Sequence, residues 1–428
     1  MNRPAQESSL FDSFQCSGTS PPSQAPGART AAVRAGIATE TQHGAVVPPL
    51  YLSTNYTFSG FNQKRAYDYT RSGNPTRDEL GSALARLEGG AGGIVTSSGM
   101  SAVLLATQLA GPRDLIVAPH DCYGGTYRLL SKLSERGSFS VCFVDENDPA
   151  AVDAALARTP KLVWIETPSN PLLRITDIRQ LASLAHQAGA IVVADNTFLS
   201  PALQRPLDLG ADLIVHSTTK YLNGHSDVVG GAAISKTQAL HQELSYWANC
   251  LGLTGAPFDS YLTLRGLRTL HARLAVHQQN ASAIADLLIH HPAVAEVHYP
   301  GLSAHPGHEI ARKQQTGFGA MVSFALKGDT SHVRAFLDEL TLFSLAESLG
   351  GVESLIAHPA TMTHAAMDPQ ARQRAGIGDT LLRLSVGIED TSDLLRDLER
   401  ALDRVANRNS AAVTGAAAPA AVAEELGS

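Results

Sequence analysis

The stretch Leu213-Ile-Val-His-Ser-Thr-Thr-Lys220 places three hydroxyl residues and a lysine directly after an apolar run. The run predicts a short buried strand, and a lysine at the end of such a strand is desolvated, which lowers the pKa of its amine. A neutral amine can attack an aldehyde and form a Schiff base. The hydroxyls of Ser217 and Thr219 are suited to phosphate oxygens. A lysine after a strand is more often a solvated surface cation, so the rest of the chain must decide between these interpretations.

Five further runs of this kind lie upstream, and helical patterns separate most of them. They are short, rich in β-branched residues and end in small or polar residues: Gly93–Thr96, Asp114–Ala118, Val141–Val144, Leu162–Glu166 and Ile191–Ala194. One helix is expected to begin near Asp177, with its apolar residues on one face, and to stop at Gly189. Alternating strands and helices predict βαβ units and a mainly parallel sheet of the α/β class.

Ligands of a parallel α/β sheet bind beyond the carboxyl ends of its strands. The residues that follow the runs are therefore the first candidates for a site: Ser97–Met100, Tyr123, Asn170, Asp195 and Ser217–Lys220.

Beyond about residue 256 the pattern changes and predicts a second, smaller α+β domain. Two helical segments come first, at Ser260–Ala275 and Asn280–His290, and an apolar strand is expected at Ala320–Leu326. The domain would close with a strand at Leu381–Ser385 and a helix at Ser392–Ala406.

Length and composition limit the class of protein. The chain has 428 residues, 44% hydrophobic and 17% charged, as in a globular protein of two to three domains. A formal net charge of −7 argues against a generally basic nucleic-acid binder or a partner membrane of anionic lipid. Four dispersed cysteines without a Cys-x-x-Cys pair fit a reducing cytoplasm. No apolar run reaches the ~18 residues of a transmembrane helix, and the beginning of the chain lacks the apolar stretch of a signal peptide.

Several common catalytic motifs are absent from the sequence. It has no Gly-x-x-x-x-Gly-Lys-[Ser/Thr] phosphate loop, no strand followed by Gly-x-Gly-x-x-Gly, no Gly-x-Ser-x-Gly and no His-Glu-x-x-His. The 16 histidines do not fall at metal-ligand spacing, so no metal centre is expected.

Asp195 follows the run Ile191–Ala194 and precedes Lys220 by 25 residues, the span of one βαβ step. An aspartate in this place commonly caps a turn. It can also face a pyridine nitrogen and keep the ring protonated, so that the ring accepts electrons from a carbanion. Ser98-Gly99-Met100 opens a helix after another strand, where backbone N–H groups bind an anion. A lysine, an acidic ring partner and a phosphate cup together predict a pyridoxal 5′-phosphate (PLP) site.

Six longer stretches carry a further signal, and together they are highly specific: Asp68-Tyr-Thr-Arg-Ser-Gly-Asn-Pro-Thr76, Ala118–Thr126, Glu166-Thr-Pro-Ser-Asn-Pro171, Asp195–Pro201, His216–Asp227 and Leu345–Leu355. In these motifs the chain resembles the Cys/Met-metabolism PLP-dependent enzymes, from about residue 30 to about residue 405. The resemblance implies the aspartate aminotransferase-like fold type I of PLP-dependent transferases, with a large domain built on a mainly parallel sheet and a smaller C-terminal α+β domain.

The resemblance assigns roles around the cofactor. Lys220 would hold PLP through a Schiff base, Asp195 would pair with the ring nitrogen and Tyr123 would stack on the ring, although by itself Tyr123 is better explained as a core tyrosine. The phosphate would be bound by Gly99, Met100, Ser217 and Thr219 of the same chain and by Tyr69 and Arg71 of a neighbouring subunit.

A second set of residues would bind the amino-acid substrate. Arg383 would hold the α-carboxylate with Asn170 and Ser348, because a planar guanidinium binds a carboxylate through two hydrogen bonds. Its surroundings alone fit equally well an arginine on a half-exposed strand. Glu347 would receive the amino group of an incoming cysteine, and Arg128 is also assigned to the substrate side.

The expected reaction is a γ-replacement that joins O-succinyl-L-homoserine and L-cysteine to give L-cystathionine and succinate. The stretches Trp247–Ser260 and Ala357–His364 resemble the bacterial members that catalyse it, and Gly125 stands where methionine γ-lyases usually carry cysteine. Ser72 departs from the enterobacterial pattern, which has a second arginine there, and is common in cystathionine γ-lyases. A γ-lyase or an O-acylhomoserine sulfhydrylase therefore stays as an alternative. A cofactor-binding protein without turnover and a metal hydrolase are the alternatives from other classes.

The chain is expected to divide into five parts: a disordered extension at 1–28, an arm at 29–75 that contacts a neighbouring subunit, a PLP-binding domain at 76–255, a small domain at 256–408 and a disordered tail at 409–428. A site completed by a neighbour implies at least a dimer, and the family is usually tetrameric. The expected partners are amino-acid substrates and further copies of the chain, with no nucleic acid and no membrane.

Overall fold

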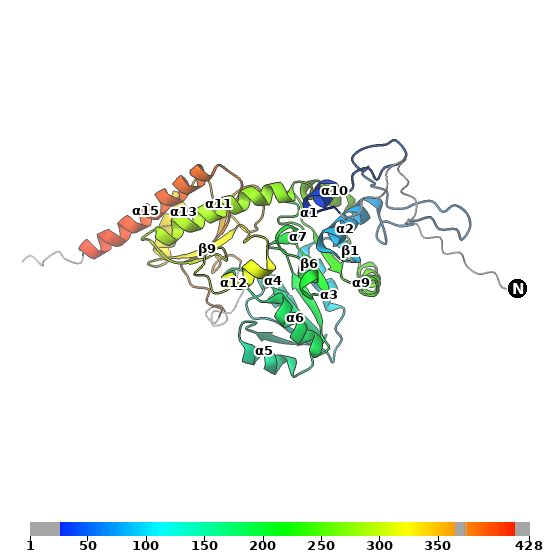
Figure 1. Ribbon diagram of the computed structural model, residues 1–428, viewed down its shortest axis with the longest axis horizontal. Helices are drawn as coiled ribbons and strands as arrows, with labels where there is room; N and C mark the ends of the chain where they lie inside the picture. The colour runs from blue at the N-terminus through cyan, green and yellow to red at the C-terminus, as the bar shows by residue number, and fades with distance from the viewer. Residues whose placement is uncertain (1–25, 364–371, 373–374, 416–428) are drawn as a thin grey trace, which may run out of the picture.

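Two β-sheets organise the chain (Figure 1), and the computed structural model describes residues 26–363, 372 and 375–415. The larger sheet has seven strands in the order β1-β7-β6-β5-β4-β2-β3. β2 to β6 pair in parallel, and β7 is antiparallel to both of its neighbours. The prediction of an α/β fold with a mainly parallel sheet is confirmed. The strands are β1 Gly92–Thr96, β2 Leu115–Pro119, β3 Ser140–Val144, β4 Leu162–Glu166, β5 Ile191–Asp195, β6 Leu213–His216 and β7 Gly231–Ser235.

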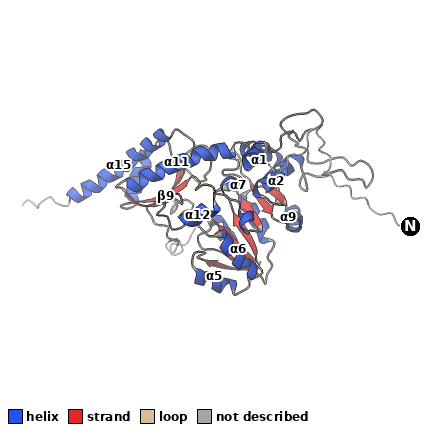
Figure 2. Ribbon diagram, viewed as in Figure 1, coloured by secondary structure: helices blue, strands red, loops and turns tan. Residues whose placement is uncertain are grey.

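Helices cover both faces of this sheet (Figure 2). Successive strand residues point to opposite faces, so Ile214 packs in one apolar cluster with α2 and α6, whereas Val215 packs in another with α3, α4 and α9. The helices of this part are α2 Pro75–Glu88, α3 Gly99–Thr107, α4 Gly124–Glu135, α5 Pro149–Leu156, α6 Ile178–Gln187, α7 Ser200–Leu203, α8 Pro206–Leu209 and α9 Gln238–Leu251.

Local sequence explains where the helices around this sheet begin and end. Asn74 caps α2 by accepting hydrogen bonds from the backbone N–H groups of its first turn, and Gly89 ends it in the left-handed conformation. Asp177 caps α6 in the same way, as expected, and the chain turns at Gly189 with φ 78°.

A five-stranded sheet, in the order β10-β11-β12-β9-β8, forms the centre of the C-terminal part. Its strands are β8 Val294–His298, β9 Met321–Leu326, β10 Ser344–Leu345, β11 Leu355–Ala357 and β12 Leu381–Ser385. The long helix α11 runs from beside α10 toward α13 and packs on β8, β9 and α15 (Figure 1). The remaining helices given by the described residues are α1 Ala28–Val33, α10 Pro257–Leu267, α11 Leu270–His290, α12 His308–Gln314, α13 Thr330–Glu339 and α15 Thr391–Gly415.

The structure contains strands that the sequence analysis did not predict, among them β7, β8, β10 and β11. The strand β7 was not predicted, because Gly231-Ala-Ala carries almost no β propensity and only the position between β1 and β6 makes it a strand. The predicted helix ends at residues 275 and 280 were wrong: the break lies before Leu270, and α11 continues unbroken to His290. The residues between the two predicted helices lie inside α11, and one of them, His277, is buried with its Nδ1 2.6 Å from the Val386 carbonyl.

The structure describes part of each predicted terminal segment. α15 continues to Gly415, seven residues past the predicted end of the small domain at 408, and residues 416–428 of the predicted tail lie outside the described residues. The N-terminal extension lies outside the described residues, apart from its last three positions.

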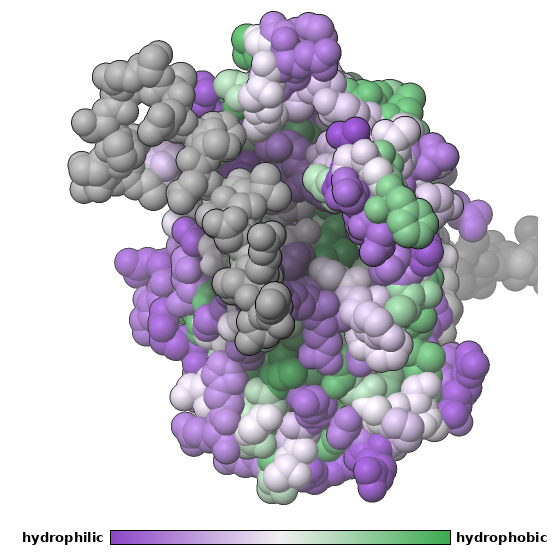
Figure 3. Space-filling model, turned by 90° about the vertical axis from the view of Figure 1, so that its right-hand side faces the viewer, coloured by the Kyte–Doolittle hydropathy of each residue, from purple (hydrophilic) through white to green (hydrophobic). Residues whose placement is uncertain are grey.

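An arm precedes α2 and lies at one end of the molecule, away from the small sheet (Figure 1). It carries exposed apolar side chains, with Leu52 at 64% and Phe61 at 101% of full exposure. Figure 3 shows the face at this end, where hydrophobic groups occur in small patches among hydrophilic ones. Among the helices of the described ranges, none is long and apolar enough to cross a membrane.

Candidate active site

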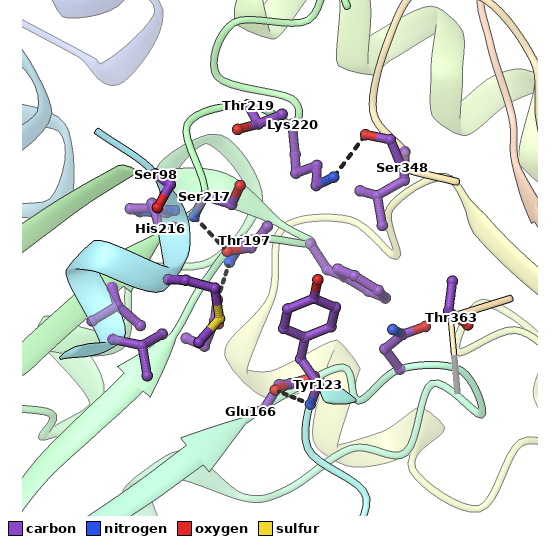
Figure 4. A pocket seen from close by; sticks show the side chains of 18 of the residues that line it. Ser98, Tyr123, Glu166, Thr197, His216, Ser217, Thr219, Lys220, Ser348 and Thr363 are labelled. Carbon is purple, nitrogen blue, oxygen red and sulfur yellow. Dashed lines mark hydrogen bonds between the residues drawn. The ribbon is translucent and has the colours of Figure 1, made fainter. Parts of the chain in front are cut away.

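A cavity of about 470 Å³ opens at the carboxyl ends of β4, β5 and β6, where α3 and α4 begin. Residues of the small-sheet part close its other side: Glu347, Ser348, Leu349, Met362, Thr363 and Arg383. Figure 4 shows Lys220, Ser217 and Tyr123 around this cavity. The cavity therefore lies beyond the carboxyl ends of the parallel strands, where a ligand site was expected.

Lys220 lies in the cavity four residues beyond the end of β6. Its Nζ donates a 2.6 Å hydrogen bond to Ser348 Oγ (Figure 4). Burial lowers the pKa of the amine to about 8, the nearby charge of Arg383 acts in the same direction, and Glu347 opposes them. Near neutral pH a usable fraction of this amine is therefore neutral, as a Schiff-base lysine requires.

Asp195 ends β5 in the same cavity, and the register of the sheet places Glu166, the last residue of β4, beside it. Burial raises the pKa of both carboxyl groups, and the charge of Asp195 adds to the rise at Glu166. Hydrogen bonds from Thr197 oppose the rise at Asp195, whose Oδ1 accepts the Thr197 N–H at 3.0 Å. A protonated ring nitrogen would satisfy this buried acid.

The first turn of α3 forms a cup for an anion. Ser98 caps the helix by accepting a 3.1 Å hydrogen bond from the Ser101 N–H. The N-terminal end of α3 faces the cavity. A Cβ on Gly99 would lie only 2.8 Å from Cβ of Ser217, so the glycine is needed for this close approach. No hydrogen bond within the described residues uses Ser217 Oγ. Thr219 adds a second hydroxyl, already bonded to the Gly230 N–H at 3.0 Å.

Tyr123 stands directly before α4, and its ring points into the cavity (Figure 4). Its backbone N–H donates a 2.8 Å hydrogen bond to Glu166 Oε2, which holds the residue at the end of β4. The side chain is 43% exposed, so it is not the core tyrosine that its sequence context alone favours.

Arg383 presents a guanidinium to the cavity from β12. Nη1 donates to Asn170 Oδ1 at 2.8 Å and Nη2 to the Ser348 carbonyl at 2.9 Å. Nε is buried and has no hydrogen-bond partner among the described residues. Burial lowers the pKa of the group to about 10. The arginine is 3% exposed, which excludes the half-exposed alternative, and a carboxylate in the cavity would compensate its charge.

Glu347 and Arg128 also line the cavity and bring charges of opposite sign to its wall. Tyr69 and Arg71 do not line it. Arg71 donates to the Asn249 carbonyl at 2.8 Å and lies over the Tyr69 ring, beside a second cavity between α2, β1 and α9. Within one chain they cannot reach the phosphate cup, and their role in a neighbour's site stays a prediction.

The sequence reasoning gave no role to Glu166 or Thr197, although both line the cavity. Glu166 is the last residue of its predicted strand, whereas the rule for parallel sheets points to residues beyond the strand ends. Thr197 accepts the Ser217 N–H through Oγ1 at 2.9 Å and so joins two neighbouring strand ends. Its position two residues after Asp195 was the available signal.

These residues suit PLP in size and chemistry. The cavity contains a lysine of lowered pKa, a buried acid, a helix N-terminus beside the hydroxyl of Ser217, and an aromatic ring. The family description "Cys/Met metabolism PLP-dependent enzyme" matches residues 29–403. The chain belongs to this family. Its cofactor is therefore PLP, and the predicted fold type is confirmed.

Relatives within this PLP-dependent family are similar over nearly their whole length. Cystathionine γ-synthase of Escherichia coli K12 is 58% identical over 380 residues, covering 89% of this chain and 98% of the relative. A crystal structure of cystathionine γ-synthase from Xanthomonas oryzae pv. oryzae in complex with cystathionine has a TM-score of 0.89 and 62% identity, covering 90% of this chain and 100% of that one. Cystathionine γ-lyase of Dictyostelium discoideum is 45% identical over 376 residues, covering 88% and 97%.

Proposed function

We propose that this chain is a PLP-dependent enzyme that joins an O-acylated L-homoserine to L-cysteine, releasing the acid and giving L-cystathionine on the way to methionine. The observation that carries the proposal is the contact of Lys220, whose pKa is lowered, with Ser348, which also bonds the buried guanidinium of Arg383. The synthases of E. coli and Xanthomonas are more similar to this chain than the Dictyostelium lyase.

The cavity orients an amino acid by its α-carboxylate. Arg383 would bind that group, and Asn170 holds the guanidinium in position through the 2.8 Å bond to Nη1. The amino group then lies toward Lys220, because Ser348 bonds both residues. When bound, PLP supplies an electron-accepting ring and an aldehyde that links to the substrate amine.

Lys220 would move the protons of the reaction. Once displaced from the cofactor, its neutral Nζ would take the proton from Cα of the substrate, pass that proton on to the bound cofactor and, neutral again, take one from Cβ, so that the acyl group leaves Cγ as a carboxylate. The thiolate of cysteine adds at Cγ, and the same amine returns the protons. Tyr123, whose ring points into the cavity, is placed to assist, and Glu347 would bind the amino group of the incoming cysteine.

The acyl group we propose is succinyl. A specific observation keeps the lyase reaction as the second candidate: Ser72 Oγ donates to the Tyr69 carbonyl at 2.8 Å and to Asp68 Oδ1 at 3.0 Å, and offers no positive charge. We further propose a tetramer built from dimers, with Tyr69 and Arg71 completing a neighbour's phosphate site, in the cytoplasm.

Product analysis tests the reaction. Purified protein with bound PLP is incubated with O-succinyl-L-homoserine, with and without L-cysteine, and the products are identified by mass spectrometry. Cystathionine and succinate that form rapidly with cysteine support the synthase. Little product, with cystathionine itself split into cysteine and 2-oxobutyrate, supports the lyase. Lys220→Ala is the control and should abolish turnover; substantial residual synthesis would contradict the role given to Lys220.

A further inference from the structure

Glu88 is a fully buried acid outside the cavity that the proposed reaction does not use. It is the last residue of α2 and is 0% exposed. Its Oε1 accepts a 2.8 Å hydrogen bond from Asn196 Nδ2 and lies 2.7 Å from His216 Nε2. Both partners are also buried, and Asn196 bonds Gln204 as well, so the three side chains belong to a buried polar group at the ends of β5 and β6.

The position of this carboxylate is unfavourable on two counts. A buried carboxylate loses its hydration, and an apolar side chain of similar volume would pack at least as well. A negative charge at the C-terminal end of a helix also opposes the helix dipole. Packing and helix stability therefore do not account for an acid at this position, whereas its two hydrogen bonds do.

The two partners of Glu88 are neighbours of residues in the cofactor site. Asn196 follows Asp195, and His216 precedes Ser217 and the turn that carries Lys220. The backbone N–H of Asn196 donates to the Val215 carbonyl at 3.1 Å. Glu88 is thus one more link between the end of β5, which carries Asp195, and the end of β6, which leads to Ser217 and Lys220.

The ring of His216 is oriented by this contact. The carboxylate of Glu88 accepts from Nε2, so the other ring nitrogen, Nδ1, is directed away from Glu88. That Nδ1 is buried and has no hydrogen-bond partner among the described residues, and His216 lines the cofactor cavity. The charge of His216 is one of the influences that oppose the rise in the pKa of Asp195.

We propose that Glu88 is a positioning residue of the cofactor site. Its carboxylate orients His216 and Asn196, and through them it sets Asp195 in the correct place relative to Ser217 and Lys220. The proposal rests on the PLP site assigned above, and it does not depend on which reaction that site catalyses.

The test compares two buried carboxylates. Glu88→Gln keeps the size of the side chain and removes its charge. The matched control is Asp397→Asn, since Asp397 is 2% exposed and bonds Thr341 and Leu342 at a distance from the cavity. For each protein, cofactor-free chain is titrated with PLP to obtain Kd, the absorption spectrum of the loaded enzyme is recorded, and the melting temperature, kcat and KM are measured.

Glu88→Gln is expected to weaken PLP binding about tenfold or more, because a neutral amide holds His216 and Asn196 less firmly than a carboxylate does, and tenfold corresponds to about 1.4 kcal/mol. The absorption band of the loaded enzyme should shift, and kcat should fall more than KM for the amino acid rises. Asp397→Asn should lower the melting temperature and leave both the Kd of PLP and the spectrum as in the parent.

A Kd within twofold of the parent, an unchanged spectrum and a lowered melting temperature for Glu88→Gln would overturn the proposal, since they describe a structural role only. If that variant does not fold, Glu88→Asp keeps the charge on a shorter side chain that cannot reach both partners. It should weaken PLP binding in the same way, and parent-like binding would again overturn the proposal. A parent enzyme that binds PLP and makes no cystathionine would contradict the proposed reaction and leave this test intact.

Discussion

Ser348 bonds both Lys220 and Arg383, and through this residue the two parts of the chain meet in one site. Its Oγ accepts from Lys220 Nζ at 2.6 Å, and its carbonyl accepts from Arg383 Nη2 at 2.9 Å. The backbone of Ser348 has a φ of 86°, which residues other than glycine rarely adopt. Such strain persists where the surrounding contacts require it, and here those contacts join the amine of Lys220 and the guanidinium of Arg383 through one residue.

The amine of Lys220 should react at lower pH than a solvated lysine. In the cofactor-free enzyme we expect its rate of acylation by an amine-specific reagent to rise with pH, with a midpoint near 8. Glu347→Gln removes a charge that raises the pKa of this amine, so the midpoint should move to lower pH. Mass spectrometry of the peptide that contains Lys220 follows the reaction, with the exposed Lys161 as the internal reference. A midpoint near 10.5 would contradict a desolvated amine.

Arg383→Lys should weaken substrate binding more than cofactor binding. Lysine keeps the charge and loses the planar fork that holds Asn170, the Ser348 carbonyl and a carboxylate together. We expect KM for the acylated homoserine to rise roughly 10- to 100-fold, from the loss of a charged hydrogen bond of about 1.5–3 kcal/mol. The Kd of PLP should change little.

The matched control for Arg383→Lys is Arg273→Lys. Arg273 is also a buried arginine, and it bonds the Tyr221 and Gly266 carbonyls outside the cavity. Its replacement should lower stability without a selective effect on KM. Equal effects of the two substitutions on KM would count against a carboxylate site at Arg383.

Gly125→Ala should displace the ring of Tyr123. A Cβ at Gly125 would lie 2.5 Å from Tyr123 Cε1 and 2.8 Å from Met100 Sδ, so one of them must move. A displacement of this kind in an active site costs on the order of 10- to 100-fold in kcat. Steady-state kinetics and the absorption spectrum of bound PLP measure it. Gly378→Ala, where a Cβ would meet nothing within 4 Å, is the control, and a silent Gly125→Ala would show that the ring is free to adapt.

His277 should make the protein less stable in acid. Burial lowers the pKa of this histidine to about 4 from 6.5, and its Nδ1 lies 2.6 Å from the Val386 carbonyl. Below pH 6.5 His277 binds a proton in the unfolded chain and stays neutral in the folded chain. The free energy of unfolding therefore decreases as the pH falls toward 4, by up to about 3 kcal/mol. His277→Gln should remove this component.

Melting temperatures of the parent and His277→Gln at pH 5 and pH 7.5 test the prediction. The parent should lose more stability between the two values than the variant does. An identical loss in both proteins would assign the acid sensitivity to other groups.

Most of the large sheet and its site could be predicted, because the signals are local. Each strand is a short apolar run, and the residues that follow it, such as Asp195 and Ser217, reach the cavity by the geometry of parallel strands. The strand β7 and the position of the helix break before Leu270 could not be predicted. Their own residues have weak or misleading propensities, and packing against distant elements decides their conformation.

The sequence by itself determined the α/β class, the lysine and its acid partner, and the family motifs, since these depend on residue types at short spacings. Only the tertiary structure decided which side chains meet. Arg383 and Asn170 are 213 residues apart and share a hydrogen bond, Glu88 reaches His216 across 128 residues, and Glu166 comes to lie beside Asp195. Contacts of this kind arise when whole layers pack, because a buried polar group without a partner is costly and most such groups therefore bond whatever partner the fold brings near.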